Sequence, residues 1–528
     1  MVYYIIHYFC VFCNRLEENS IYFSHRKCFL RYVIEFFAEV CYNDKKYGAV
    51  CTEVFMNPVF SEFKRKFSLS TYKNYKIALG EMTFFKDFVT DTKGDLYPVI
   101  EKSEDCVEKV MKNSYRVCGG SVKRMVCQYF PYATYELTAD IEGGEAGFTF
   151  MLPSTSAGIV MTGEEVVFTC MDSVERVKLS APLTTDVTLI VSCRPKFFDV
   201  YFKRNGKPEF FRTFTHESFK DADLYSEFSD GYALLSVCGS VTVNSVYSYL
   251  DSGVSIADMR PIKYENGDVI YENGKIYFSA SLRLQAGCCQ GVFSWAPGTA
   301  QFELTGAMFY DCGDGRWRGY VAPSILYHRE KKEWYVWVSA FEYTHILACG
   351  RFEGDPRFGI NVIDVISMPE AAEGEDISSF VGFRRDEDPD FYFDEELGKW
   401  RMAICRIDPR IGKYVYVFFE SDEPLAGYKY IGKALDGCET GGSFVNVEGE
   451  RFFVCGNDFE RKSEYRIYSK DGMSVAKFNY PDGGFRGWGS IIPVKMCGRM
   501  RYFWMTFDRH KGSGYNWSYG NVYVFEAK

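Results

Sequence analysis

The chain has 528 residues, of which 47% are hydrophobic and 25% charged, a balance that excludes a disordered chain and predicts two or three folded domains. The net charge of −10 argues against a nucleic-acid or anionic-membrane partner, because both need a basic surface. Aromatic residues reach 18%; they favour strands and can form platforms for sugars, although most would belong to a large β core.

The 19 cysteines are scattered without a regular framework, and a chain of this length does not depend on disulfides. We therefore expect free thiols in a reducing cytoplasm. Cys10 and Cys13 form a CxxC pair, but no second pair follows at zinc spacing, so no metal site is expected there. The first apolar stretch lacks the positive start of a signal peptide and is too short to span a bilayer.

Residues 1–124 are expected to form a partly helical extension. Apolar residues recur at helical spacing over 29–42 (FLRYVIEFFAEVCY), and 82–91 (MTFFKDFVTD) is a candidate for a second, short helix. The texture changes near Met125, where the extension is expected to end.

Residues 125–254 predict a β-sandwich of the concanavalin or jelly-roll type. Apolar and polar residues alternate over 135–141, and similar short runs follow at turn-punctuated intervals up to GYALLSV at 231–237. Asn205-Gly206 lies between two aromatic runs, which is a strong hairpin signal. The sandwich could bind carbohydrate or serve as a structural support.

Residues 255–528 contain an internal repeat that indicates a five-bladed β-propeller. Each repeat is a strand, a tight polar turn and a strand rich in aromatics, and the repeats recur every 50 to 65 residues. The five repeats span 267–281, 322–340, 388–407, 442–458 and 489–508. The fold class is therefore all-β, with a C-terminal propeller preceded by a sandwich.

Carboxylates recur near the start of the first strand in several repeats. Asp268 (with Asn266 two residues earlier), Asp388 and Glu439 occupy this place in the first, third and fourth repeats. The innermost strands of a propeller start near its central channel, so these side chains are expected to converge. Gathering like charges costs stability, which favours a functional reason, although each residue could also be an ordinary turn residue.

The third repeat resembles the third-blade motif of the five-bladed glycoside hydrolases of families 43 and 32. Asp388-Pro389, a hydrophobic strand, an acidic turn and Gly398-Lys399-Trp400 carry the resemblance. Ala322-Pro323-Ser324 is similar to the second-blade Ala-Pro-Asp of family 43, with Ser in place of Asp. Glu439 lies about one residue from the family's acid Glu. The resemblance covers about residues 260–525.

The resemblance implies a glycosidase in which three carboxyl groups divide the work. Asp268 would be the base on water or the nucleophile, Glu439 the general acid, and Asp388 the group that orients the acid. It implies a furanoside or related glycan as substrate and allows a structural calcium ion, with no other cofactor required. A non-catalytic glycan-binding propeller and a glycoside phosphorylase remain alternatives. Residues expected to contact sugar are Trp317, Arg318, Arg384 and Trp488, each Trp with core packing as the other interpretation.

Overall fold

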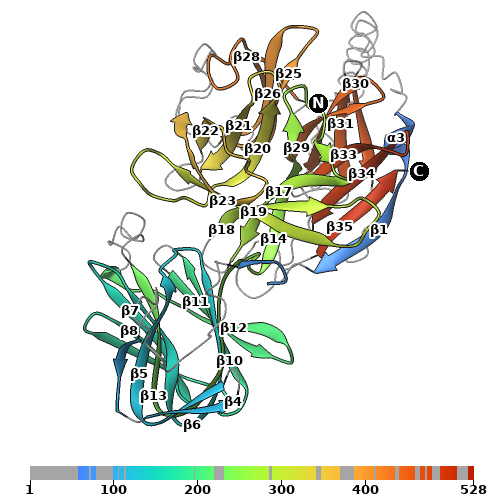
Figure 1. Ribbon diagram of the computed structural model, residues 1–528. Helices are drawn as coiled ribbons and strands as arrows, with labels where there is room; N and C mark the ends of the chain where they lie inside the picture. Colours follow the sequence, from blue (N-terminus) through green and yellow to red (C-terminus); the bar gives the residue numbers. More distant parts are fainter. Residues whose placement is uncertain are drawn as a thin grey trace, which may run out of the picture. The chain divides into compact units, whose positions relative to one another are not determined.

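The protein was analysed as a computed structural model, which describes residues 57–70, 73–78, 99–104, 106–111, 114–194, 197–218, 231–284, 288–340, 346–368, 386–408, 412–434, 439–457, 464–469, 472–477, 488–507 and 521–527. These residues are mostly β-strand, and the short helix α3 (Pro58–Ser61) precedes the first strand (Figure 1). No helix in this part of the chain is long and apolar enough to cross a bilayer. The helices expected over 29–42 and 82–91 lie outside the described residues.

Five sheets of four to six strands form the five blades of a β-propeller. Blade 1 contains β14 (Ser255–Pro261), β16 (Tyr271–Glu272), β17 (Lys275–Arg283), β18 (Cys288–Trp295), β19 (Phe302–Asp311) and β23 (Gly359–Asp364). Blade 2 contains β15 (Lys263–Tyr264), β20 (Val321–His328), β21 (Glu333–Ala340), β22 (Ile346–Phe352) and β24 (Ile366–Met368). Blade 3 contains β25 (Asp386–Asp394), β26 (Lys399–Asp408), β27 (Lys413–Ser421) and β28 (Lys429–Lys433).

The last two blades have four strands each. Blade 4 contains β29 (Glu439–Val447), β30 (Glu450–Asn457), β31 (Glu464–Ser469) and β32 (Gly472–Lys477). Blade 5 contains β33 (Gly489–Met496), β34 (Arg499–Phe507), β35 (Asn521–Ala527) and β1 (Phe63–Ser70). The innermost strands β14, β20, β25, β29 and β33 contact one another in a closed ring. The expected five-bladed propeller is confirmed.

The fifth blade is completed by a strand from the other end of the chain. β1 pairs antiparallel with β35, from Phe63 opposite Ala527 to Ser70 opposite Asn521, and the blue β1 lies beside the red β35 in Figure 1. This pairing covers the edge of β35, which would otherwise expose a row of backbone hydrogen-bonding groups. The propeller therefore consists of two segments that are distant in the sequence.

Strand pairing departs from the expected segment boundary at 124. Residues 63–70, which were expected in the extension, belong to blade 5. β3 (Val99–Lys102), β4 (Val107–Met111) and the first half of β5 (Ser114–Gln128) already pair within the next sheet. The sheet that a strand joins depends on the strand with which it pairs, and that partner can be remote in sequence. The composition of residues 1–124 gives no information about such partners.

The strands between β1 and the first blade form one twelve-stranded sheet. Its members are β2 (Lys76–Ala78), β3, β4, β5, β6 (Thr134–Met151), β7 (Ser156–Met161), β8 (Glu165–Cys170), β9 (Ser173–Lys178), β10 (Val187–Arg194), β11 (Phe197–Arg204), β12 (Lys207–Phe214) and β13 (Tyr232–Asp251). Asn205 and Gly206, both with positive φ, connect β11 to β12 as the hairpin signal predicted. The division of these strands into a two-layered sandwich stays a prediction.

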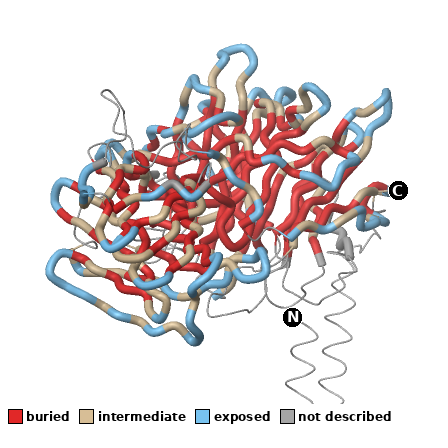
Figure 2. The backbone as a smooth tube through the Cα atoms, turned by 60° about the horizontal axis from the view of Figure 1, so that its bottom comes forward, coloured by how far each residue is buried: buried red, intermediate tan, exposed pale blue. Residues whose placement is uncertain are grey.

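The cores follow the alternation of the strands. Figure 2 shows buried backbone along the strands and exposed backbone at the turns. Side chains from the twelve-stranded sheet form one apolar cluster. Separate clusters lie between neighbouring blades, where the aromatic strands of the repeats pack. The high aromatic content therefore belongs mostly to these cores, and the ring of innermost strands is held rigidly around the propeller axis.

Candidate active site

Four of the five innermost strands carry the same irregularity near their first residues. The register against the second strand of the blade slips by one residue after Ala257, Val321, Glu387 and Thr440, so that two residues of the innermost strand lie opposite one residue of its partner. The first residue of each slip has a positive φ: Asp258 (55°), Ala322 (52°), Asp388 (54°) and Gly441 (61°). These four positions are therefore structurally equivalent. Bulges of this kind re-aim side chains and are common next to active sites.

Asp388 is the carboxyl group that the third-blade bulge presents. It is 5% exposed, and its Oδ2 accepts hydrogen bonds from Thr440 Oγ1 (2.9 Å), Gly441 N (3.0 Å) and Trp488 Nε1 (3.1 Å). Its backbone N–H donates to Ser339 Oγ in blade 2 (2.9 Å). Residues from blades 2 and 4 and from the start of blade 5 therefore fix the position of Asp388.

Asp258 is the second carboxyl group of the site, presented by the first-blade bulge. It is 3% exposed, and its Oδ2 forms an ion pair with Arg283 Nη2 at 2.6 Å. Burial raises the pKa of Asp388, and the negative charge of Asp258 raises it further, against the hydrogen bonds from Gly441 and Thr440 and the charge of Arg260. The two carboxyl groups thus interact electrostatically.

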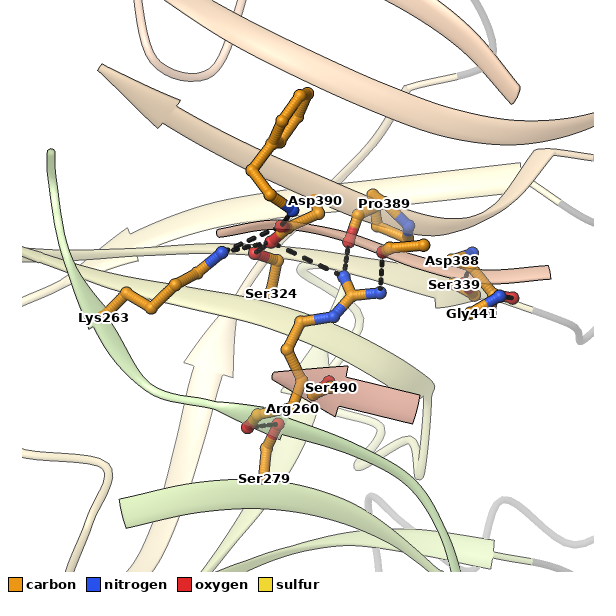
Figure 3. Close-up of polar contacts among 12 residues, drawn as sticks. Arg260, Lys263, Ser279, Ser324, Ser339, Asp388, Pro389, Asp390, Gly441 and Ser490 are labelled. Carbon is orange, nitrogen blue, oxygen red and sulfur yellow. Dashed lines mark hydrogen bonds and ion pairs between the residues drawn. The ribbon is translucent and has the colours of Figure 1, made fainter. Parts of the chain in front are cut away.

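A buried ionic cluster lies next to this pair (Figure 3). Lys263 Nζ contacts both oxygens of Asp390 at 2.8 Å, and Ser324 Oγ donates to Asp390 Oδ1 at 2.6 Å. The Arg260 guanidinium donates to the carbonyl oxygens of Pro389 and Gly442 and lies 4.9 Å from the centre of the Trp488 ring. The cluster joins blades 1 to 5 through residues that are almost completely buried.

The charges in this cluster compensate one another. Burial acts to raise the pKa of Asp390, but the charges of Lys263 and Arg260 and the hydrogen bonds outweigh it, so the pKa lies below its ordinary value. Burial lowers the pKa of Lys263, against the attraction of Asp390. A buried pair of this kind is destabilising when only one partner is removed.

The residues at this point do not fit the calcium ion that the sequence resemblance allows. A calcium ion takes six to eight oxygen ligands, mostly carboxylates, carbonyls and waters. Asp390 already accepts four hydrogen bonds, from Lys263 (two), Ser324 and Phe444 N, which is the full capacity of a carboxylate. Within the described ranges, no group of three His, Cys, Asp or Glu side chains could hold a metal ion.

The structure does not bring Asp268 to Asp388. Asp268 is exposed, and its Oδ2 accepts a hydrogen bond from Asn266 Nδ2 at 3.0 Å. The adjacent Gly267 lies against Tyr392, four residues along β25 from Asp388, which places Asp268 toward the opposite end of that strand. Asp268 is therefore a turn residue, and Asp258 holds the place in the first blade that was expected for it.

Asp258 was not predicted from the sequence, because blade 1 begins earlier than the repeat suggested. Its innermost strand β14 is separated from its partner β17 by β15 and β16, so the blade does not start with a tight hairpin as the others do. The signal that could have found it is the short apolar run Val254–Pro261 just before the first repeat, which contains a single acidic residue.

The other expected site residues have different locations. Trp488 lies under Gly441 and supports Asp388 as a buried donor. Trp317 packs on Phe130 and Phe309 beyond the outer part of blade 1, and Arg318 forms an ion pair with Asp314. Neither contacts the carboxyl pair. Arg384 and the side chain of Glu439 lie outside the described residues; the backbone of Glu439 opens β29, next to Thr440.

No protein-family model matches the sequence, and no curated relative matches it. Solved structures that resemble the chain include a family 43 β-1,3-galactosidase with galactodeoxynojirimycin (11% identity, covering 50% of this chain and 93% of that one, TM-score 0.36). Others are the catalytic domain of a Coprinopsis cinerea family 62 α-L-arabinofuranosidase (12%, 52% and 90%, 0.35) and a family 117 glycoside hydrolase from Zobellia galactanivorans (12%, 52% and 84%, 0.37). At these identities the similarity concerns the fold alone.

Proposed function

We propose that this protein is a glycoside hydrolase whose active site is the carboxyl pair Asp258 and Asp388. The observation that carries the proposal is the presentation of both side chains by equivalent bulges in the ring of innermost strands, close enough for the charge of one to act on the other. Most glycoside hydrolases cleave the glycosidic bond with a pair of carboxyl groups in the active site. The sequence resemblance to families 43 and 32 supports the same class.

In the proposed site Asp258 replaces Asp268 as the first-blade carboxylate. The Arg283 guanidinium lies 2.6 Å from Oδ2 of Asp258 and fixes the position of that oxygen. A furanoside or related glycan is the proposed substrate class, in keeping with the sequence resemblance.

A panel of aryl furanosides and pyranosides tests the activity. We expect the wild-type protein to hydrolyse at least one member, and Asp258→Asn to lower kcat by roughly 10²–10⁴-fold on that substrate. Asp268→Asn is the matched control, since it makes the same change in the same blade at an exposed turn, and it should leave kcat unchanged. An inactive Asp268→Asn beside an active Asp258→Asn would refute the assignment.

A non-catalytic glycan-binding propeller is the second candidate. The observation that favours it is the place of the family's fourth-blade acid, where Thr440 uses its hydroxyl to donate to Asp388. In that case no aryl glycoside of the panel would be cleaved, and calorimetric titration with oligosaccharides would give the same affinity for wild type and Asp258→Asn.

A further inference from the structure

At three of the bulges, a side chain donates a hydrogen bond to the carbonyl oxygen of the second bulge residue. A bulge leaves one residue outside the regular ladder of backbone hydrogen bonds. In blades 1, 3 and 4 this second residue is Met259, Pro389 and Gly442. The carbonyl oxygen of Met259 accepts from Ser490 Oγ at 2.9 Å, and Arg260 donates to the other two. Side chains therefore supply partners for the backbone where the ladder is disrupted.

Arg260 reaches the other blades from its place in the first one. It lies on β14, two residues after Asp258, and its side chain is 0% exposed. Nη1 donates to the carbonyl oxygen of Pro389 in blade 3, and Nη2 donates to that of Gly442 in blade 4 at 2.9 Å (Figure 3). The same guanidinium lies 4.9 Å from the centre of the Trp488 ring, just before blade 5. One side chain therefore links blade 1 to blades 3 and 4 and to the start of blade 5.

Charge balance alone does not account for Arg260. Lys263 already contacts both oxygens of Asp390 at 2.8 Å, whereas Arg260 Nη1 lies 3.8 Å from Oδ1. Burying a second cation costs free energy, which favours a reason beyond stability. The guanidinium is a planar fork that can hold two acceptors at a fixed separation, and an ammonium group has no such fixed geometry.

We propose that Arg260 is a positioning residue of the active site, which holds the bulges of blades 3 and 4 at one fixed separation. The proposal rests on the proposed glycosidase function and deepens it, and it does not depend on which carboxyl group donates the proton. In blade 3, Pro389 directly follows Asp388. In blade 4, Gly442 directly follows Gly441, so the two hydrogen bonds fix the peptide groups next to both bulge residues. Asp388 depends on that separation, because it accepts a hydrogen bond from Gly441 N across the two blades at 3.0 Å.

Two substitutions separate the geometry of Arg260 from its charge. On the substrate that wild type hydrolyses, Arg260→Met should lower kcat by roughly 10²-fold while KM changes much less, since a misplacement of about 1 Å has effects of this size. Arg260→Lys keeps the charge without the fork, so it should lose kcat to a similar extent. An Arg260→Lys variant with the kcat of wild type would overturn the proposal, because charge alone would then suffice.

Ile159→Ala is the control for a general loss of stability. Ile159 lies on β7, completely buried in the apolar cluster of the twelve-stranded sheet, and its truncation leaves a cavity. The assays are run at a temperature at which circular dichroism shows every variant folded. Ile159→Ala should have a lower Tm than wild type and the same kcat. If it loses the same fraction of kcat as Arg260→Met, the role of Arg260 is only structural and the proposal is overturned.

Hydrogen–deuterium exchange tests the same role without activity. In Arg260→Met, and in Arg260→Lys if the first variant does not fold, peptides that contain the bulges at 386–394 and 439–447 should lose protection. The peptide 321–328 contains the bulge of blade 2, to which Arg260 donates no hydrogen bond within the described ranges, and it should keep its exchange rate. Unchanged exchange in all three peptides, or an equal loss in all three, contradicts the proposal. Absence of hydrolysis in every wild-type assay would refute the proposed function, and the exchange pattern would still decide whether Arg260 holds the two bulges.

Discussion

At the level of single residues, the centre of the propeller contains buried charged side chains that lie within contact of one another. Asp390 and Lys263 are both almost completely buried, at 0% and 1% side-chain exposure, and Lys263 donates two of the four hydrogen bonds that Asp390 accepts. Asp388, two residues before Asp390 on β25, and Asp258 on β14 are both acidic groups and lack this mutual compensation. Stability is therefore concentrated in one pair and the proposed chemistry in the other.

Loss of one charge from the buried pair should be severe. We expect Lys263→Met to lower the free energy of unfolding by about 3–5 kcal/mol, because Asp390 would be left buried without a counter-ion. Adding Asp390→Leu should recover much of the loss. Because folding lowers the pKa of Asp390 below 3.8, the pair contributes fully above that pH. The difference between wild type and Lys263→Met should therefore shrink as the pH falls through the folded pKa.

Urea unfolding at several pH values measures this effect. Lys275→Met is a suitable control, since Lys275 forms a solvent-exposed pair with Glu303 on blade 1, and exposed pairs contribute little. A Lys263→Met variant as stable as this control would contradict the account of the cluster.

The same cluster predicts independence from calcium. Since Lys263 supplies the positive charge at Asp390, a chelator should leave the Tm of the wild-type protein unchanged, and added calcium should not raise it. Differential scanning fluorimetry with and without EDTA checks this expectation. A drop in Tm of several degrees on chelation would show that a metal ion stabilises the fold elsewhere.

At the level of elements, the equivalent bulges explain why the site is where it is. At the bulge near the start of an innermost strand, a positive φ turns one side chain away from the alternating pattern of the strand. Four blades have this bulge, and the residue with the positive φ is Asp, Ala, Asp and Gly in blades 1 to 4. These four blades thus share the same backbone bulge, while the residue at the bulge determines which functional group the blade contributes.

Gly441 is the bulge residue least able to change. Its positive φ disfavours any L side chain, and a Cβ there would lie 2.6 Å from Trp488 Cγ. We expect Gly441→Ala to cost about 2–4 kcal/mol through strain and overpacking, and to displace the donors of Asp388. Gly449→Ala is the matched control, because Gly449 has φ +86° with open space around it, and about 1 kcal/mol is expected.

Chemical denaturation of both glycine variants provides the comparison. Equal losses of stability at the two positions would mean that Trp488 moves aside easily and does not fix the position of Asp388.

At the level of the whole molecule, the propeller is closed by a strand that precedes the twelve-stranded sheet in the chain. The sheet's strands lie between β1 and β14 in sequence, so they form an insertion between the last and first blades. A fragment that begins at residue 255 would lack β1 and expose the edge of β35 to intermolecular pairing.

A circular permutant tests this closure. We expect residues 255–528 alone to aggregate, whereas 255–528 followed directly by 56–72 should be soluble and show a cooperative thermal transition. The connection is short, because Ala527 pairs with Phe63 in the native blade. Size-exclusion chromatography and circular dichroism of the two fragments measure the difference. A soluble, cooperatively folded 255–528 fragment would show that β1 is dispensable.

The sequence by itself determined the local elements and their repetition. The hairpins predicted over 322–340, 388–407, 442–458 and 489–508 correspond to β20–β21, β25–β26, β29–β30 and β33–β34, because alternating aromatic residues and tight polar turns specify antiparallel pairs over short distances. The place of Asp388 at the start of an innermost strand followed from the same pattern.

Only the tertiary structure decided which segments meet across long distances. The pairing of β1 with β35, the role of β14 as the innermost strand of blade 1, and the substitution of Asp258 for Asp268 all depend on partners remote in sequence. Local propensity carries no information about such partners, since one strand pairs with another through backbone groups common to all residues. Trp488 illustrates the same limit. Its indole ring was expected to stack on a sugar, but the residue packs under Gly441 and its Nε1 donates a hydrogen bond to Asp388.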